Sequence, residues 1–134
     1  MKIKVSAIQL RNRPGDRNAS FAAAEELIGK AASEGAALAA LPELSSCGYI
    51  PNDLIWNYGE AADGETADWA GRTAKRFSVY VGAGFLETDG RDFFNSYLIA
   101  APDGKIAGRI RKMKPSRKAR SCCSRWVATR PLKS

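Results

Sequence analysis

The segment AALAALPELSSCGY, from Ala36 to Tyr49, decides how this chain is organised. Its first six residues are apolar, a length that suits a buried strand, and this run stops at Pro42 and Glu43. Open α/β folds gather their functional groups at the carboxyl ends of their strands. Glu43 is therefore the first candidate for a functional side chain.

The residues before this segment predict a strand and a helix. Lys2 to Leu10 carries β-branched and apolar residues on both faces, which predicts a strand buried on both sides. Apolar residues then recur at spacings of three and four, which predicts a helix capped by Asn18 or Ser20, running to about Ser33 and stopped at Gly35. Strand, helix and the next strand together make a βαβ unit.

The residues after Tyr49 predict an irregular stretch, a second helix and three more strands. In chain order these are residues 50–63, a helix over 65–77, a strand over 79–87, and a hairpin of 93–101 with 105–111 around an Asp-Gly turn. This order predicts an α/β fold in which one layer of mixed sheet has helices on one face. The other face of the sheet then needs a partner.

Charge is distributed very unevenly along the 134 residues. The formal net charge is +7, but ten of the 21 Lys and Arg lie between residues 109 and 134, where no Asp or Glu occurs. Residues 1–108 therefore hold eleven basic and all fourteen acidic side chains, which is typical of an ordinary soluble domain. The basic tail and Trp126 leave a nucleic-acid-binding module as the alternative function, although a charge run is usually just solvated.

Several classes of protein are disfavoured by what the sequence lacks. It has no apolar segment near the ~20 residues of a membrane span and no signal-peptide pattern at its start, so we expect a cytoplasmic protein without a membrane partner. It has no His, and its three Cys form no Cys-x-x-Cys pair. We therefore expect no metal site and no cofactor.

The segment LPELSSCGY resembles the first catalytic signature of the carbon-nitrogen hydrolase (nitrilase) superfamily. Gly108 to Lys112, GRIRK, looks like the second signature. Five further stretches are similar to the family in composition and place, namely KVSAIQL at 4–10, Gly15-Asp16 with Asn18, GFLE at 84–87, FNS at 94–96 and DGKI at 103–106. The resemblance covers roughly residues 2 to 115. It implies half of a nitrilase-like α-β-β-α sandwich, with residues 1–115 as the N-terminal part of a hydrolase domain.

The resemblance also implies roles for two side chains. The family hydrolyses nitrile, amide or carbamoyl C–N bonds with a Glu-Lys-Cys triad, in which Glu43 maps to the general base and Lys112 to the cation. Lys114 is the second choice for the cation, because the signature usually reads Arg-Lys-x-His and this chain departs from it at the last residue. Glu87 and Asn95 are candidates for groups that orient the site. Full-length members often assemble, so a homo-oligomer is possible.

The nucleophile of the triad has no match in this chain. In the family it lies downstream in a Gly-x-x-x-Cys signature, which does not occur here. Cys47 falls at a variable position of the glutamate signature, and Cys122 and Cys123 have no glycine-rich context, so we interpret all three as non-catalytic. The chain is therefore expected to be inactive by itself.

Residues 116–134 form a separate segment with its own prediction. They are rich in Ser, Arg, Cys and Trp and show no periodicity, which is typical of a GC-rich gene read out of frame. We expect this basic tail to be non-native or disordered and the chain to be a truncated, frameshifted relic. A gene without an open continuation in another frame would contradict that prediction.

Overall fold

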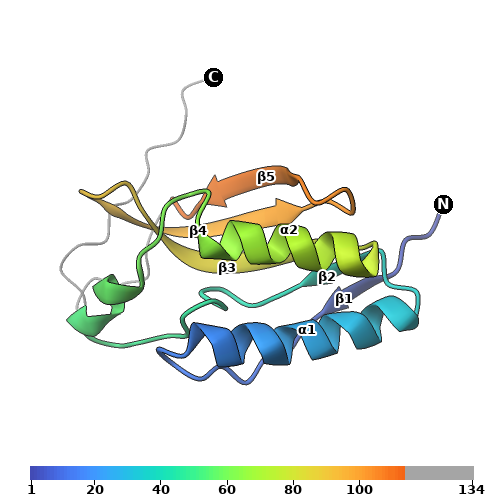
Figure 1. Cartoon of the computed structure of the whole chain (residues 1–134), viewed down its shortest axis with the longest axis horizontal. Coiled ribbons are helices and arrows are strands. Elements are labelled where there is room, and N and C mark those ends of the chain that lie inside the picture. The colour runs from blue at the N-terminus through green and yellow to red at the C-terminus, as the bar shows by residue number, and fades with distance from the viewer. Residues whose placement is uncertain (114–134) are drawn as a thin grey trace.

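The structure, a computed structural model, describes residues 1–113 and shows five strands and two α-helices (Figure 1). In chain order the elements are β1 (Val5–Ala7), α1 (Arg17–Ser33), β2 (Leu38–Ala40), a 3₁₀ helix η1 (Asp53–Tyr58), α2 (Glu65–Phe77), β3 (Tyr80–Thr88), β4 (Phe93–Ala100) and β5 (Ile106–Arg111). The tail of 116–134, predicted to be non-native or disordered, lies outside the described residues, and so do Lys114, Cys122 and Cys123.

The strands form one mixed sheet in the order β1-β2-β3-β4-β5. β1, β2 and the start of β3 run parallel, and β3, β4 and β5 are antiparallel to one another. Since Ala40 at the end of β2 pairs with Gly82, the third residue of β3, the chain leaves β2 alongside the first half of β3. The predicted α/β class with a mixed sheet is confirmed.

Both helices cover the same face of the sheet, as Figure 1 shows, and the main core lies between the two layers. Phe21 of α1 stacks on Trp69 of α2 with ring centroids 4.3 Å apart, which joins the two helices above the sheet. Val81, Ala83 and Phe85, alternate residues of β3, are fully buried beneath them. Alternation along a strand therefore sends the intervening residues to the opposite, helix-free face, which we call the open face.

The residues that begin and end the two helices agree only in part with those predicted from the sequence. Asp16, and not Asn18 or Ser20, caps α1, because its Oδ1 accepts a hydrogen bond from the Ala19 N–H at 2.9 Å. The predicted stop at Gly35 is confirmed: its φ of +85° is the left-handed conformation that glycine adopts freely. α2 ends on Ser78, whose φ of +54° is costly for a residue with a Cβ.

The prediction for the first strand was wrong in one respect. β1 is an edge strand of three residues, and Ile3 and Val5 are exposed on the open face instead of being buried on both sides. The second strand is also short, since Pro42 cannot donate to a ladder and the chain turns there. Residues 50–63 are more ordered than expected: they contain η1, and Ile55 packs in a small second core with Leu86. No helix within residues 1–113 is long and apolar enough to span a bilayer.

Candidate active site

The loop that carries Glu43 crosses directly over β3. Leu41 N–H donates to the Gly82 carbonyl at 2.9 Å and Ser46 N–H to the Gly84 carbonyl at 3.1 Å, so both ends of the loop are fastened to the strand. A Cβ on Gly84 would lie 2.6 Å from the backbone nitrogen of Leu44. Glycine at position 84 is therefore what lets the loop approach so closely.

Three segments that are distant in sequence meet at the Glu43 carboxylate. Lys112 Nζ donates to Glu43 Oε1 at 2.6 Å, and Asn95 Nδ2 donates to the same oxygen at 2.6 Å. The backbone adds a further link, because Lys112 N–H donates to the Asn95 carbonyl at 2.8 Å. The ion pair is half exposed, with 53% of the Glu43 side chain and 43% of the Lys112 side chain accessible.

This cluster lies on the open face of the sheet. Asn95 pairs with Leu86, whereas the next residue, Ser96, pairs with Phe85, which faces the helices. Alternation therefore directs Asn95 and its neighbour Lys112 away from the helices. The two predicted site residues, Glu43 and Lys112, are brought together where the fold leaves the sheet uncovered.

Tyr97 supports this site, a role that its place in an alternating strand did not predict. Its hydroxyl donates to the Leu41 carbonyl at 2.8 Å, just before the loop of Glu43 begins, and burial raises the pKa of this phenol. The ring lies over Gly82, where a Cβ would come within 2.7 Å of the hydroxyl oxygen. The signal was the pair Gly82 and Gly84, because glycines two apart in a strand mark close approach on one face.

Glu87 belongs to a different cluster, on the helix side of the sheet. It accepts hydrogen bonds from Arg111 and from Ser96 Oγ, both at 2.6 Å, and Arg109 lies 3.8 Å away. Burial alone would raise the pKa of Glu87, but the hydrogen bonds and the two guanidinium groups outweigh it and hold that pKa below its ordinary value. Glu87 thus fixes β5 at Arg111, the residue before Lys112, and does not contact Glu43.

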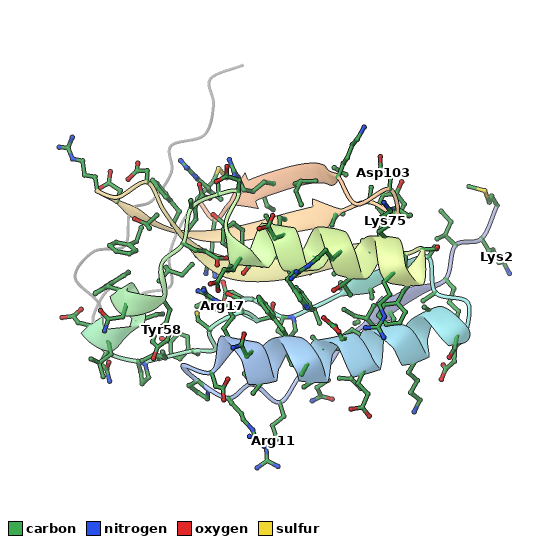
Figure 2. All side chains as sticks on the ribbon, in the orientation of Figure 1. Lys2, Arg11, Arg17, Tyr58, Lys75 and Asp103 are labelled. Carbon is green, nitrogen blue, oxygen red and sulfur yellow. The ribbon has the colours of Figure 1, made fainter. Side chains whose placement is uncertain are left out.

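A further ion-pair cluster lies around Arg17 and joins three helical segments. Arg17, in the first turn of α1, donates to the Tyr58 carbonyl at 2.9 Å and lies 3.4 Å from the buried Glu60 and 2.5 Å from Glu65 (Figure 2). Burial raises the pKa of Glu60, against the opposing effect of Thr66 and Arg17. One arginine therefore joins α1, η1 and the start of α2.

Cys47 is placed where it cannot serve as a nucleophile. Its side chain is fully buried in the small core with Leu44 and Ile55, and its Sγ contacts the Gly48 carbonyl at 3.3 Å. Burial raises the pKa of this thiol to about 11, so the reactive thiolate is scarce at neutral pH. Within residues 1–113 Cys47 is the only cysteine, and there no three His, Cys, Asp or Glu side chains gather as metal ligands.

Comparison with known proteins agrees with this geometry. Residues 4–127 match the sequence model of a family described as carbon-nitrogen hydrolase, a range that runs past residue 115 into the tail. The chain belongs to the carbon-nitrogen hydrolase family. It is 32% identical over 114 residues to a nitrilase from Pyrococcus abyssi, covering 83% of this chain and 43% of that protein. It is also 29% identical over 113 residues to the omega-amidase NIT2-B of Xenopus laevis, covering 84% and 40%.

Solved structures show the same fold. An amidase from Nesterenkonia sp. superposes on 96% of this chain with a TM-score of 0.82 at 16% identity, and 48% of that amidase is covered. An N-terminal amidase superposes on 90% with a TM-score of 0.77 at 22% identity, and 30% of it is covered. The predicted nitrilase-like half-sandwich is confirmed, and the chain spans less than half the length of these relatives.

Proposed function

We propose that the open face carries two members of a carbon-nitrogen hydrolase triad, with Glu43 as the general base and Lys112 as the cation. The observation that supports this proposal is the 2.6 Å contact between Lys112 Nζ and Glu43 Oε1, formed by residues 69 positions apart. Family membership supplies the reaction class, hydrolysis of a C–N bond in a small nitrile, amide or carbamoyl compound. The cytoplasmic location remains a prediction from the sequence.

The two carboxylate oxygens of Glu43 have different roles in this proposal. Oε1 is held by Lys112 and by Asn95, so this oxygen is occupied and the carboxylate cannot rotate freely. Oε2 is then the atom that takes a proton from an attacking thiol and later gives it to the leaving amine. Asn95 acts on the reaction through Glu43, as a positioning residue.

Lys112 supplies a positive charge near the place where negative charge develops during the reaction. When a thiolate adds to an amide carbon, the carbonyl oxygen becomes negative, and an ammonium group fixed beside the base stabilises that oxygen. The Arg111–Glu87 pair on the other face holds the end of β5 in place, so that Lys112 remains within reach of Glu43.

We further propose that the 134-residue chain does not turn over substrate by itself. Cys47 is buried, and the sequence context of Cys122 and Cys123 does not match the nucleophile signature. A thiolate must therefore come from the part of the family's fold that this chain does not span. The chain alone should release no ammonia above the buffer rate from a panel of small aliphatic amides and nitriles.

A fusion protein tests the proposed roles directly. Residues 1–113 would be joined to the C-terminal half of the Nesterenkonia amidase, whose N-terminal half has the same fold, so that a complete sandwich with a cysteine nucleophile results. The expected result is ammonia release from that amidase's own substrate, lowered at least ~100-fold by Lys112→Met, since that variant removes a charge that acts in the transition state. Lys105→Met, in the β4–β5 turn, is the matched control and should leave the rate unchanged. Equal rates for both variants would contradict the role of Lys112.

A further inference from the structure

The residue after Glu43 has a backbone conformation that leucine rarely adopts. Leu44 has a φ of +52°, in the left-handed region, where the Cβ crowds the following carbonyl oxygen. Among the residues other than glycine within 1–113, only Ser78, at the end of α2, shares this feature. A leucine held in this way lowers the folding equilibrium constant about 5- to 30-fold. The surrounding structure must therefore impose the conformation.

The left-handed residue breaks the alternation of side chains along the chain. Glu43 accepts a hydrogen bond from Asn95. Leu44 packs in the small core with Leu86. Asn95 and Leu86 are cross-strand partners in β3 and β4 and lie on the same open face. Two consecutive residues of an extended chain would point to opposite faces, so the conformation of Leu44 is what lets Glu43 and the buried leucine share one face.

Packing and backbone hydrogen bonds hold Leu44 in this conformation. The residue is 2% exposed, and its carbonyl accepts hydrogen bonds from the Gly48 N–H at 2.8 Å and the Cys47 N–H at 3.2 Å. A turn that closes on Leu44 in this way cannot relax to an extended backbone without withdrawing the leucine from its core. Burial of one side chain thus stabilises the strained turn beside Glu43.

The next residue, Ser45, fastens the turn to β3. The ladder between β2 and β3 ends with Ala40 and Gly82, so β2 offers Gly84 no partner. Ser45 Oγ donates to the Gly84 carbonyl at 3.2 Å and accepts from the Gly84 N–H at 3.2 Å. Buried backbone groups need such partners, and Ser45 itself is only 3% exposed. One hydroxyl therefore takes the place of a strand residue beside the Glu43 turn.

We propose that Leu44 and Ser45 are positioning residues, which hold a strained turn over β3 and thereby keep the Glu43 carboxylate directed at Lys112. Leu44 acts through its left-handed backbone and buried side chain, and Ser45 acts through its two hydrogen bonds to Gly84. That the directed carboxylate is a general base rests on the proposed function. Its direction does not, so the two proposals can fail separately.

The order of stability of two small substitutions tests the strain, by urea denaturation of the full 134-residue chain. At Leu44, alanine and glycine both empty the same part of the small core, but only glycine is free of the left-handed strain. Leu44→Gly should therefore have an unfolding equilibrium constant about fivefold lower than Leu44→Ala.

Leu86 is the matched control, since it is fully buried in the same small core and lies inside β3. There the order should reverse, with Leu86→Gly less stable than Leu86→Ala by about two- to fivefold in the same equilibrium constant. The same order at both positions would overturn the proposal.

A spectroscopic signature tests the direction of the carboxylate. In NMR of the chain with isotope-labelled lysine, the ammonium signal of Lys112 reports its ion pair with Glu43, and Glu43→Gln gives the position of that signal without the charge. Ser45→Ala, which deletes one oxygen atom, should move the signal towards that position. Ser20→Ala is the matched control, because Ser20 is 1% exposed and its Oγ has no hydrogen-bond partner within residues 1–113. An unmoved signal in Ser45→Ala, or an equal shift in Ser20→Ala, would overturn the proposal.

Kinetics of the fusion with the Nesterenkonia amidase half add a readout that loss of stability does not imitate. Ser45→Ala should lower kcat about 10- to 100-fold and leave KM within about twofold, since it displaces the base and not the substrate. A raised KM with an unchanged kcat would contradict positioning. If Glu43→Gln leaves the fusion fully active, the proposed function fails, and the stability order and the Lys112 signal still decide the role of Leu44 and Ser45.

Discussion

Gly84 is the residue on which the position of Glu43 depends. Its Cα faces the loop backbone so closely that a methyl group would lie 2.6 Å from Leu44 N and 2.7 Å from the Pro42 carbonyl oxygen. These are backbone atoms, which cannot turn aside as a side chain can. The contact therefore constrains the residue type at this position more strongly than its burial does.

We predict that Gly84→Ala lowers the free energy of unfolding by about 2–3 kcal/mol, because the loop must lift off β3 to make room. Gly108→Ala is the matched control: Gly108 is on the same face of the sheet, in β5, and nothing lies within 4 Å of its Cβ position. That control should be neutral or slightly stabilising. Urea denaturation of the three proteins gives the comparison, and equal losses for the two alanines would refute the close approach.

Glu87 makes the stability of the fold depend on pH. Its pKa in the folded chain lies below the ordinary value of 4.5, so the ionised carboxylate stabilises the fold above that value. The contribution is lost as the pH falls through the lower folded-state pKa. Glu87→Gln should lower the free energy of unfolding by about 2 kcal/mol at pH 7, since it removes the negative charge to which Arg111 and Ser96 both donate hydrogen bonds.

The difference in the free energy of unfolding between Glu87→Gln and the natural chain should therefore shrink as the pH falls below about 4.5. Urea titrations between pH 3.5 and 7 measure this difference. Ser96→Ala, which removes one hydrogen bond to the same carboxylate, should cost less, about 1 kcal/mol, at pH 7. A difference that stays constant over the whole range would show that the carboxylate charge is not what stabilises β5.

At the scale of single residues the sequence pointed to side chains that the structure brings together, but not to the groups that hold them in place. Glu43, Lys112 and Asn95 stand in recognisable patterns, and the structure places their side chains together. Tyr97 and Arg17 were not found, because a tyrosine in an alternating strand and an arginine at a helix start are ordinary surface choices. Only the fold shows that each of them fastens a loop.

At the scale of elements, α2 ends under local strain. Ser78 follows its last residue with φ +54° and ψ +40°, and its N–H donates back to the Ala74 and Lys75 carbonyls. Glycine adopts this conformation without the Cβ clash that costs other residues about 1 kcal/mol. We predict that Ser78→Gly raises the free energy of unfolding by about 0.5–1 kcal/mol.

The same substitution at Ser33, the last residue of α1, is the control and should lower stability, because glycine is unfavourable at a helical position. Thermal unfolding followed by circular dichroism measures both variants. A loss of stability in Ser78→Gly would mean that its hydroxyl has a role that its backbone conformation does not reveal.

The elements themselves were largely predictable from periodicity. The second helix occurs at residues 65–77 as expected, and the hairpin of β4 and β5 forms around the Asp-Gly turn, with Gly104 at φ +87°. The error at β1 has a physical cause. An apolar strand shows that both of its faces can be buried, but the pattern does not show whether the chain contains anything to cover the second face.

At the scale of the whole molecule, one face of the sheet is packed and the other is open. α1 and α2 bury the first face (Figure 1), and on the second a small core of Leu44, Cys47 and Ile55 packs against Leu86 of β3. The candidate site stands at the boundary between that small core and the bare apolar strands. The Glu43–Lys112 pair and the bare apolar strands are thus two parts of one face.

The central claim is that Glu43 retains the function of a general base on this face. The measurement that tests it most directly is ammonia release by the fusion of residues 1–113 with the C-terminal half of the Nesterenkonia amidase, comparing Glu43→Gln with Glu26→Gln, an exposed glutamate on α1. We predict that Glu43→Gln lowers kcat/KM by at least ~100-fold, since removing a general base costs ~10²–10⁴, while Glu26→Gln leaves it unchanged. Full activity of the Glu43→Gln fusion would contradict the account.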